Sequence, residues 1–405
     1  MKILQINCVY DYGSTGKLTR CIHEGLVERG IESVVLYGRR DKKNISNVYK
    51  TCTELEAKTW NLISRVNGHP YEVAPVGTSK LIRYLKKEKP DVVHLQCING
   101  FFVNIYHLVA YLKQHQIPTV LTLHAEFMFT GGCSHALDCE QWSEDKGCNS
   151  KSCPGYGSEL RSLCSNQSSY MWKKMKQAFY GFEKLQVVSV SPWLMKRAGR
   201  SSILGDKSQC VVYNGVNTEI FYYRCEEAKR LRGYHQWENK KVVFHVTPAF
   251  SSNSDHLKGG YYVLELAKQM PDTVFLVAGE CKEEIAFPEN LKMLGKIVDE
   301  EMLAAYYSMA DVTVLTSKRE TFSMVCAESL CCGTPVVGFL AGGPETIAIS
   351  EYSQFCNYGN IEQLEKLLSD KRTYEKNIIA EEAQKKYAIS EMIEKYIGIY
   401  HQMSD

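Results

Sequence analysis

The sequence predicts an α/β protein made of two Rossmann-like domains, and three observations support this. Short apolar runs of strand length alternate with amphipathic helical stretches in both halves of the chain. With 405 residues, of which 44% are hydrophobic, the chain is long enough to fill two cores. A turn-rich segment over residues 199–217, which includes Asn214-Gly215, separates the two halves.

The elements follow one another in a regular order. Predicted helices between the strands include Leu18–Arg29, Lys80–Lys89, Tyr261–Gln269 and Glu300–Met309. The predicted strands cover Lys2–Val9, Ser33–Tyr37, Asp91–Gln96, Pro118–Leu123, Leu185–Val190, Val211–Tyr213, Lys241–Val246, Thr273–Ala278, Val312–Leu315 and Pro335–Phe339. We expect two parallel sheets covered by helices, one from each half, with Val211–Tyr213 opening the second set.

Charge and hydropathy limit the partners of the chain. Residues 1–200 hold 27 Lys and Arg against 17 Asp and Glu, whereas residues 201–405 hold 21 against 29. The basic first half suits anionic acceptors or a peripheral contact with an anionic membrane, and uneven but solvated faces are the alternative. No apolar run is long enough to span a bilayer, and the N-terminus reads as a strand rather than a signal peptide. We therefore expect a cytoplasmic protein, and nothing indicates a nucleic-acid partner.

Two glutamates, Glu320 and Glu328, are the most informative pair of residues. An apolar strand precedes them, Glu320 is expected in a loop, and a helix is expected to begin close to Ser323. The first N–H groups of such a helix form an anion site, and Glu328 follows one to two turns later. Phosphates on the N–H groups and hydroxyls on the two carboxylates would suit a nucleotide-sugar.

The surroundings of this pair resemble a known family. Glu320 and Glu328 with seven residues between them, followed by Gly333-Thr334-Pro335 and Gly342-Gly343-Pro344-Glu345, resemble the retaining GT-B glycosyltransferases of glycosyltransferase family 4, also called glycosyl transferases group 1. The resemblance extends, more weakly, over nearly the whole chain. It includes Asn214-Gly215-Val216-Asn217, where the family usually has Asp in place of Asn217.

This resemblance implies a fold and a division of the chain. The fold would be GT-B, with two Rossmann-like domains that face each other across a cleft. Residues 1–205 would form the acceptor-side domain, with a Cys-rich loop at 131–164, and residues 206–388 the donor-binding domain. Residues 389–405 would form a helix that returns to the first domain.

The same resemblance assigns roles to the donor-site residues. Lys258 would hold the donor diphosphate together with the N–H groups near Ser323, Met324 and Val325. A lysine beside a helix start is also electrostatically unfavourable by itself, which favours a bound anion there. Glu328 would hold the ribose and Glu320 the sugar. The arginine that usually accompanies the lysine has no counterpart in the preceding loop, where His256 is the nearest polar cation.

Three further residues come from the first half. His124 follows a predicted strand, where the family places a histidine on the donor sugar, although Ala125 replaces the usual Asp and Glu126 is an uncertain substitute. Without that context a lone histidine is more often structural. Gly13 and Gly16 lie in a loop where family members bring backbone to the diphosphate, and an ordinary strand-to-helix turn is the alternative. A P-loop is excluded, because Asp11 and Leu18 occupy positions that require Gly and Ser or Thr.

Four thiols predict a metal site. Cys133, Cys139, Cys148 and Cys153 fall in one loop rich in Gly, Ser and charge, which is typical of a structural Zn²⁺ site. Reduced surface thiols and two disulfides are the alternatives. No Asp-x-Asp triplet is present, so the sequence provides no Mg²⁺ clamp, and we expect no cofactor to be required for catalysis.

Together these features predict a retaining glycosyltransferase. It would move a sugar from a UDP- or GDP-sugar to a hydroxyl of a growing, lipid-linked bacterial surface glycan of the capsule, exopolysaccharide or lipopolysaccharide type. A GT-B epimerase or phosphorylase would use the same donor site without an acceptor glycan. A protein that binds a nucleotide-sugar without catalysis is the third reading, supported by Ala125 and the missing arginine.

Overall fold

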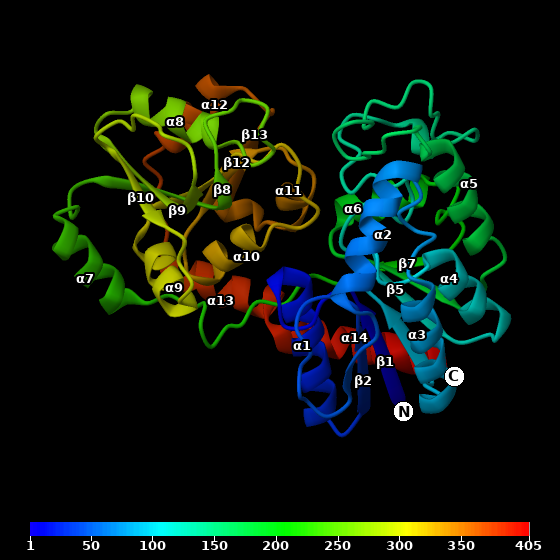
Figure 1. Cartoon of the computed structure of the whole chain (residues 1–405). Coiled ribbons are helices and arrows are strands. Elements are labelled where there is room, and N and C mark those ends of the chain that lie inside the picture. The colour runs from blue at the N-terminus through cyan, green and yellow to red at the C-terminus, as the bar shows by residue number, and fades with distance from the viewer. Residues whose placement is uncertain (405) are drawn as a thin grey trace. The chain divides into compact units, whose positions relative to one another are not determined.

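The computed structural model describes residues 1–404 and divides the chain into two compact α/β units (Figure 1). One unit comprises Met1–Val212 together with Ile393–Asp405, and the other comprises Tyr213–Met392. Each unit contains one sheet whose strand pairings are all parallel within the described residues. The prediction of two parallel sheets covered by helices is confirmed.

The first sheet has seven strands in the order β3-β2-β1-β4-β5-β6-β7. These strands are β1 (Lys2–Asn7), β2 (Glu32–Tyr37), β3 (Val48–Lys50), β4 (Val92–Leu95), β5 (Thr119–Leu123), β6 (Leu185–Ser189) and β7 (Ser208–Val211). The helices of this unit are α1 (Gly13–Glu28), α2 (Glu54–Asn67), α3 (Pro75–Glu88), α4 (Ile105–Gln114), η1 (Gln141–Ser143), α5 (Ser168–Phe179) and α6 (Pro192–Arg200). The order reverses between β1 and β4, the place where open α/β sheets bind ligands.

The second sheet has six strands in the order β10-β9-β8-β11-β12-β13. These strands are β8 (Lys241–Phe250), β9 (Thr273–Cys281), β10 (Leu291–Gly295), β11 (Val312–Leu315), β12 (Val336–Phe339) and β13 (Ser353–Cys356). The helices of this unit are α7 (Cys225–His235), α8 (Gly260–Gln269), α9 (Glu300–Met309), α10 (Met324–Cys331), α11 (Gly343–Ile347), η2 (Ser350–Tyr352), α12 (Ile361–Leu368) and α13 (Lys376–Tyr387). Here the order reverses between β8 and β11.

Strand β7 belongs to the first unit, whereas the sequence predicted a strand here in the second. Residues near Val211 were expected to open the second set, but β7 pairs with β6, with Gln186 opposite Ser208 and Ser189 opposite Val211. The first unit therefore ends at Val212 rather than at residue 205. The hydrogen-bonded pairing of β7 with β6 places β7 in the first unit. A pattern of apolar residues does not show which neighbouring strand a strand pairs with.

The last helix, α14 (Ile389–Ser404), joins the first unit from Ile393 onward. The Tyr396 hydroxyl lies 2.9 Å from Thr122 Oγ1, and the Tyr400 hydroxyl lies 2.7 Å from His94 Nδ1. Desolvation, with a smaller contribution from His124, lowers the pKa of His94 to about 3, so this imidazole is neutral when it bonds Tyr400. These contacts fix α14 against β4 and β5.

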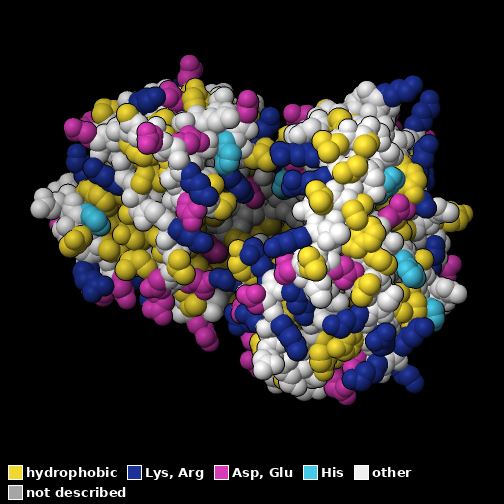
Figure 2. All heavy atoms as spheres, viewed as in Figure 1, with side chains coloured by type: hydrophobic (Ala, Val, Ile, Leu, Met, Phe, Trp, Pro, Cys, Tyr) yellow, Lys and Arg dark blue, Asp and Glu magenta, His cyan; other side chains and the backbone are white. Residues whose placement is uncertain are grey.

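None of the helices in residues 1–404 has the length and hydropathy needed to cross a bilayer. Figure 2 shows Lys and Arg side chains spread over the visible face of the first unit rather than gathered into one patch.

Candidate functional site

The predicted donor-site residues of the second unit lie at the carboxyl ends of β8 and β11. Lys258 is in the connection after β8, and Glu320 is in the loop after β11. Lys258 Nζ lies 2.6 Å from Glu320 Oε1, and both side chains are only partly exposed. The structure thus brings together two residues that are 62 positions apart in the sequence. They meet where the strand order reverses.

The connection that carries Lys258 requires a glycine. Gly259, the N-cap of α8, has φ +67°, and a Cβ there would lie 2.0 Å from the Thr316 carbonyl oxygen. The Thr316 hydroxyl donates to the Lys258 carbonyl at 3.2 Å, and the Lys318 N–H donates to the Leu257 carbonyl at 2.8 Å. These contacts hold the Lys258 segment against the end of β11. Lys258 therefore precedes α8, which begins at Gly260.

The Gly342-Gly343-Pro344-Glu345 motif holds the loop of Glu320 in place. The Glu320 N–H donates to the Ala341 carbonyl at 3.0 Å, and the Gly343 N–H donates to the Glu320 carbonyl at 2.8 Å. A Cβ on Gly343 would lie 2.5 Å from the Thr321 carbonyl carbon and oxygen. Glu345 accepts hydrogen bonds from the N–H groups of Ala341 and Gly342 at 3.1 and 2.8 Å. The motif thus holds the backbone at Glu320 in place.

Helix α10 starts where the sequence predicted. Ser323 is its N-cap, with an unusual φ of +81°, and its hydroxyl accepts from the Cys326 N–H at 3.3 Å. Strain of this kind is concentrated at functional sites. The N–H groups of Met324 and Val325 belong to the first turn, where a helix provides no internal partner. A group with negative charge placed there would find both donors and the positive end of the helix dipole.

Glu328 lies one turn further along α10, and its Oε2 accepts from the Tyr307 hydroxyl of α9 at 3.2 Å. Burial, and then the neighbouring Glu328 charge, raise the pKa of Tyr307 far above its usual range, so Tyr307 stays a donor. Tyr307 orients the carboxylate, and sequence reasoning missed it because no motif links Tyr307 to Glu328.

In the first unit, His124 directly follows β5 and is partly buried. Desolvation lowers the pKa of His124 to about 4, so the ring is neutral at pH 7 and can both donate and accept a hydrogen bond. Gly13 is the first residue of α1, with φ +63°, and a Cβ on Gly16 would lie 3.1 Å from Val9 Cγ2 and 3.2 Å from the Asp11 nitrogen. The positive φ of Gly13 and the close packing at Gly16 favour glycine for local reasons, and the contact of either residue with a donor stays a prediction.

Glu126 has a structural role that the sequence did not reveal. It is fully buried, forms an ion pair with the Arg197 guanidinium and accepts from the Ala136 N–H at 2.6 Å. Arg197 also lies 3.0 Å from Glu140. Glu126 thus anchors the Cys-rich loop to α6, and it does not replace the acid that is missing at Ala125.

The four cysteines of that loop line a single cavity of ≈ 290 Å³. All are free thiols, Cys133 and Cys148 are buried, and the Gly131 N–H donates to Cys148 Sγ at 3.2 Å. Desolvation and then the nearby Cys153 raise the pKa of Cys133. Within residues 1–404, however, no three His, Cys, Asp or Glu side chains stand in an arrangement that could hold a metal ion. The zinc site therefore stays a prediction.

Elemental analysis of the purified protein tests the zinc prediction. We expect about one zinc per chain, because four thiols around one cavity match the number and type of ligands that structural zinc requires. Cys133→Ser should lose the metal and unfold more readily. Cys164→Ser, which changes an exposed thiol of the same loop, is the matched control and should keep it. Metal-free wild-type protein, with Cys133→Ser as stable as Cys164→Ser, would show that the thiols are simply reduced.

Comparisons with known proteins agree with this architecture. A family model described as Glycosyltransferase Family 4 matches residues 16–220, and one described as Glycosyl transferases group 1 matches residues 238–386. N-acetyl-alpha-D-glucosaminyl L-malate synthase of Bacillus anthracis is 21% identical, over 98% of this chain and 96% of its own length.

Two solved structures share the fold over essentially the whole chain. Sucrose-phosphate synthase of Thermosynechococcus elongatus has a TM-score of 0.66 at 16% identity, covering 100% of this chain and 99% of its own. Anabaena Alr3699/HepE, solved in complex with UDP, has a TM-score of 0.66 at 14% identity, covering 99% of this chain and 100% of its own. The same protein was also solved with UDP-glucose. These likenesses show that the fold is GT-B.

Proposed function

Since the chain belongs to glycosyltransferase family 4 and is a glycosyltransferase, we propose that it transfers a sugar, with retention, from a UDP- or GDP-sugar to a hydroxyl of a growing bacterial surface glycan. One observation carries the donor assignment. Lys258 and Glu320 are paired at 2.6 Å beside the start of α10, where the second sheet reverses its order. This arrangement offers a cation and helix N–H groups to a diphosphate, and carboxylates to hydroxyls.

The reaction that we propose uses these groups in turn. The bond between the anomeric carbon and the β-phosphate oxygen breaks, and negative charge develops on the leaving diphosphate. Lys258 and the N–H groups at Ser323, Met324 and Val325 stabilise that charge. The acceptor oxygen forms the new bond on the same face, and its proton passes to the departing phosphate oxygen. Glu328 holds the ribose, whereas Glu320 and His124 hold the sugar.

A thermal-shift panel of nucleotides and nucleotide-sugars tests the donor assignment. Ligand at a hundred times its dissociation constant stabilises the folded protein by about 2.7 kcal/mol. We expect UDP- or GDP-containing ligands to raise the melting temperature, and the complex of Alr3699/HepE with UDP favours UDP. Lys258→Ala should abolish the shift from the diphosphate and retain any shift from the nucleoside. If Lys258→Ala lost the shifts from the nucleoside and from the diphosphate equally, or kept both, the role of Lys258 would be contradicted.

Incubation with the donor alone separates the rival activities. An epimerase would isomerise the sugar, and a phosphorylase would release it with phosphate. A protein that only binds the donor would turn over nothing in the presence of any acceptor.

The relative from Bacillus anthracis is named for a product of N-acetylglucosamine and L-malate. A small acceptor such as a hydroxy acid is therefore the second candidate, to be assayed beside glycan acceptors.

We also propose that the first unit contacts a membrane through α2. Leu55, Leu62 and Val66 share one face of this helix, because they are spaced by 7 and 4 residues, and they are 78%, 67% and 41% exposed. Exposed apolar helix faces of this kind bind bilayer surfaces. This contact would place the chain where a lipid-linked acceptor is found.

Flotation with phosphatidylglycerol-containing vesicles tests the membrane contact. The wild-type protein should float with the vesicles, and Leu55→Ser with Leu62→Ser should remain at the bottom of the gradient. Tyr234→Ser, which removes an 82% exposed apolar side chain from α7, is the control and should float normally. Equal flotation of all three proteins would mean that α2 plays no part.

A further inference from the structure

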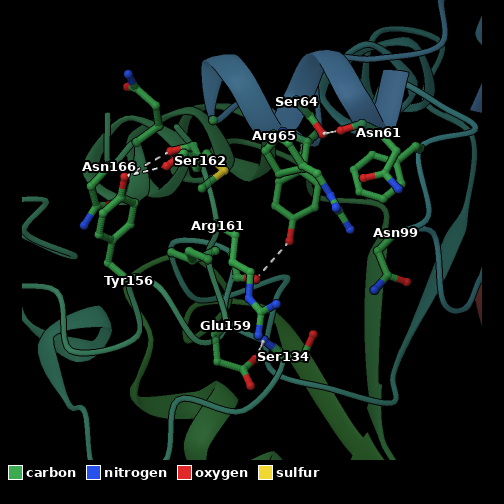
Figure 3. Close-up of a pocket in the computed structure, with 18 of the residues that line it drawn as sticks. Asn61, Ser64, Arg65, Asn99, Ser134, Tyr156, Glu159, Arg161, Ser162 and Asn166 are labelled. Atoms are coloured by element: carbon green, nitrogen blue, oxygen red, sulfur yellow. Dashed lines mark hydrogen bonds between the residues drawn. The ribbon is translucent and has the colours of Figure 1, made fainter. Parts of the chain in front are cut away.

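A second cavity lies at the carboxyl edge of the first sheet, and none of the residues assigned to the donor lines it. Its volume is ≈ 360 Å³, within the range of about 300–1,000 Å³ that is typical of small-molecule sites. Its walls come from α2, from the loop after β4 and from the long loop after β5 (Figure 3). Ligands of open α/β sheets bind at this edge.

Two arginines give this cavity a positive charge. Figure 3 shows the Arg65 side chain descending from α2 and the Arg161 side chain entering from the Cys-rich loop. Neither guanidinium has a carboxylate partner within residues 1–404, and Arg161 Nε donates only to the Ser158 carbonyl at 3.2 Å. Glu159, the one acid in the wall, accepts from the N–H groups of Ser134 and His135 at 3.0 and 3.2 Å. These backbone donors hold the Glu159 carboxylate in place, and two arginines against one acid leave the wall with a net positive charge.

The rest of the wall matches a sugar ring. Asn61 and Asn99 present amide groups to the cavity, and the hydroxyls of Ser134 and Ser162 lie in the same wall (Figure 3). Apolar surface comes from side chains such as Met171. Amides and hydroxyls pair with sugar hydroxyls, and the apolar surface covers carbon-bound hydrogens.

Hydrogen bonds hold the two arginine-bearing segments together. The Leu163 N–H donates to the Arg65 carbonyl at 2.7 Å, and the Cys164 N–H donates to the Val66 carbonyl at 3.2 Å. The loop that carries Arg161 is therefore attached to the C-terminal turn of α2. Both guanidinium groups consequently belong to one local framework rather than to two independent loops.

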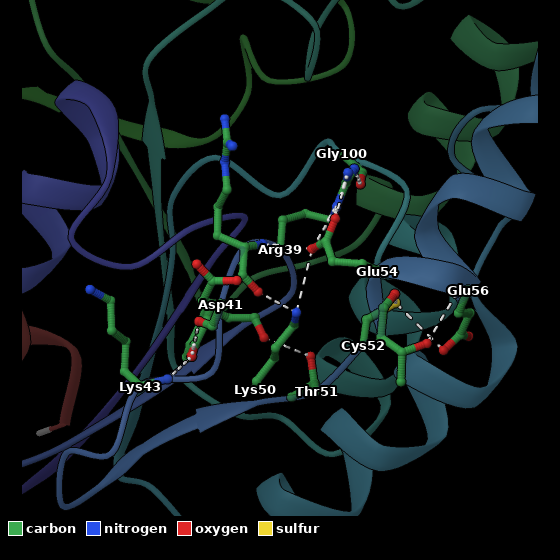
Figure 4. A network of polar contacts seen from close by, with 12 residues as sticks. Arg39, Asp41, Lys43, Lys50, Thr51, Cys52, Glu54, Glu56 and Gly100 are labelled. Atoms are coloured by element: carbon green, nitrogen blue, oxygen red, sulfur yellow. Dashed lines mark hydrogen bonds and ion pairs between the residues drawn. The ribbon is translucent and has the colours of Figure 1, made fainter.

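A polar network fixes the other end of α2 (Figure 4). Arg39 contacts Glu54, the first residue of α2, at 3.0 Å and donates to the carbonyl of Gly100 in the cavity wall, also at 3.0 Å. Desolvation raises the pKa of Glu54, but hydrogen bonds from Arg39 and the Arg40 N–H outweigh it and lower the pKa to about 2. The carboxylate is thus always charged at neutral pH, and α2 and the loop after β4 keep their spacing.

We propose that this cavity is an acceptor subsite that binds a sugar carrying a carboxylate or a phosphate, with Arg65 and Arg161 on the anionic group. Arginine suits this task, because its planar guanidinium binds carboxylate and phosphate through two parallel hydrogen bonds. The amides of Asn61 and Asn99 face the ring. The assignment of this ligand as the acceptor rests on the proposed function, whereas the binding of an anionic sugar does not.

Calorimetric titration with three monosaccharides tests the subsite. UDP is titrated first and then kept saturating, so that the donor site is filled. D-glucuronate and D-glucose 6-phosphate are the anionic probes, and D-glucose is the neutral match. We expect at least one anionic probe to bind and D-glucose not to bind, and the stronger anion identifies the acceptor group. Arg65→Gln and Arg161→Gln should each weaken that probe tenfold or more while leaving UDP affinity unchanged.

Arg83→Gln is the control, because Arg83 lies on α3 of the same unit and outside the cavity. It should bind the anionic probe as the wild type does. Absence of binding by both anionic probes, or an equal loss in Arg83→Gln, would overturn the subsite. Failure of UDP, and then of GDP used in its place, to bind in the first titration would instead count against the proposed function, so the two failures are distinguishable.

Discussion

Glu320→Ala should lower turnover by two or more powers of ten while leaving the affinity for the free nucleoside diphosphate nearly unchanged. A loss of that size equals about 2.7 kcal/mol or more of transition-state stabilisation. The contact of Glu320 with the sugar should strengthen as positive charge develops at the anomeric carbon, and losing one such contact typically costs a few kcal/mol. Steady-state kinetics with saturating donor measures the effect.

Two variants separate this role from a purely structural one. In the wild type, Lys258 Nζ donates to Glu320 Oε1 at 2.6 Å, and the amide oxygen of Glu320→Gln can accept the same bond. This variant should therefore fold normally and yet be nearly as inactive as Glu320→Ala. Glu328→Ala should weaken nucleoside, nucleoside diphosphate and nucleotide-sugar together, because the ribose is common to all three. A Glu320→Gln enzyme with wild-type turnover would remove the charge of Glu320 from the mechanism.

Glu126→Ala should destabilise the folded protein by about 3–5 kcal/mol, because it removes the buried carboxylate that pairs with the buried Arg197 and leaves this charge only the half-exposed Glu140. The substitution also leaves the Ala136 N–H without its acceptor, so the Cys-rich loop loses an anchor at the same time. Urea denaturation followed by circular dichroism gives the free energy of unfolding.

Glu140→Ala is the matched control for the buried pair. Glu140 contacts the same arginine at 3.0 Å, but its side chain is 43% exposed. An ion pair with an exposed partner contributes about 0–1 kcal/mol, so this variant should unfold close to the wild type. If both variants lose the same free energy, burial of Glu126 is not what stabilises the loop.

The central strands of both sheets could be predicted from the sequence, and the edge strands could not. β5 is buried at every residue, and its sequence Thr-Val-Leu-Thr-Leu consists of apolar and β-branched residues that favour a strand. β3, β10 and β13 lie at sheet edges, are only partly buried and have no such run, so they were missed. The strand predicted at Val211–Tyr213 overlaps β7, the remaining edge strand, only at Val211, and it was assigned to the wrong sheet. An edge strand is only partly buried, so it needs fewer apolar residues and does not stand out in the hydrophobic pattern of the sequence.

Features of the candidate site that depend on neighbouring residues in the sequence could also be predicted, whereas features that depend on distant residues could not. The order of strand, loop and helix around Glu320 is encoded within a short segment, so the sequence predicted Ser323 as the start of α10. The pairing of Glu320 with Lys258 depends on the neighbouring position of β8 and β11 in the sheet. The second cavity depends on a loop with almost no regular structure, in which Arg161 has no periodic neighbours. Neither could be found without the fold.

The place of α14 also determines the order in which the chain can be completed during synthesis. The second unit is one continuous segment, so all of it has left the ribosome once Met392 has emerged. The first unit is translated earlier but still lacks Tyr396 and Tyr400, which bond Thr122 and His94. Domains generally fold as they emerge, with the N-terminal one first. Here the N-terminal unit has to wait for α14, which is translated after the whole of the second unit.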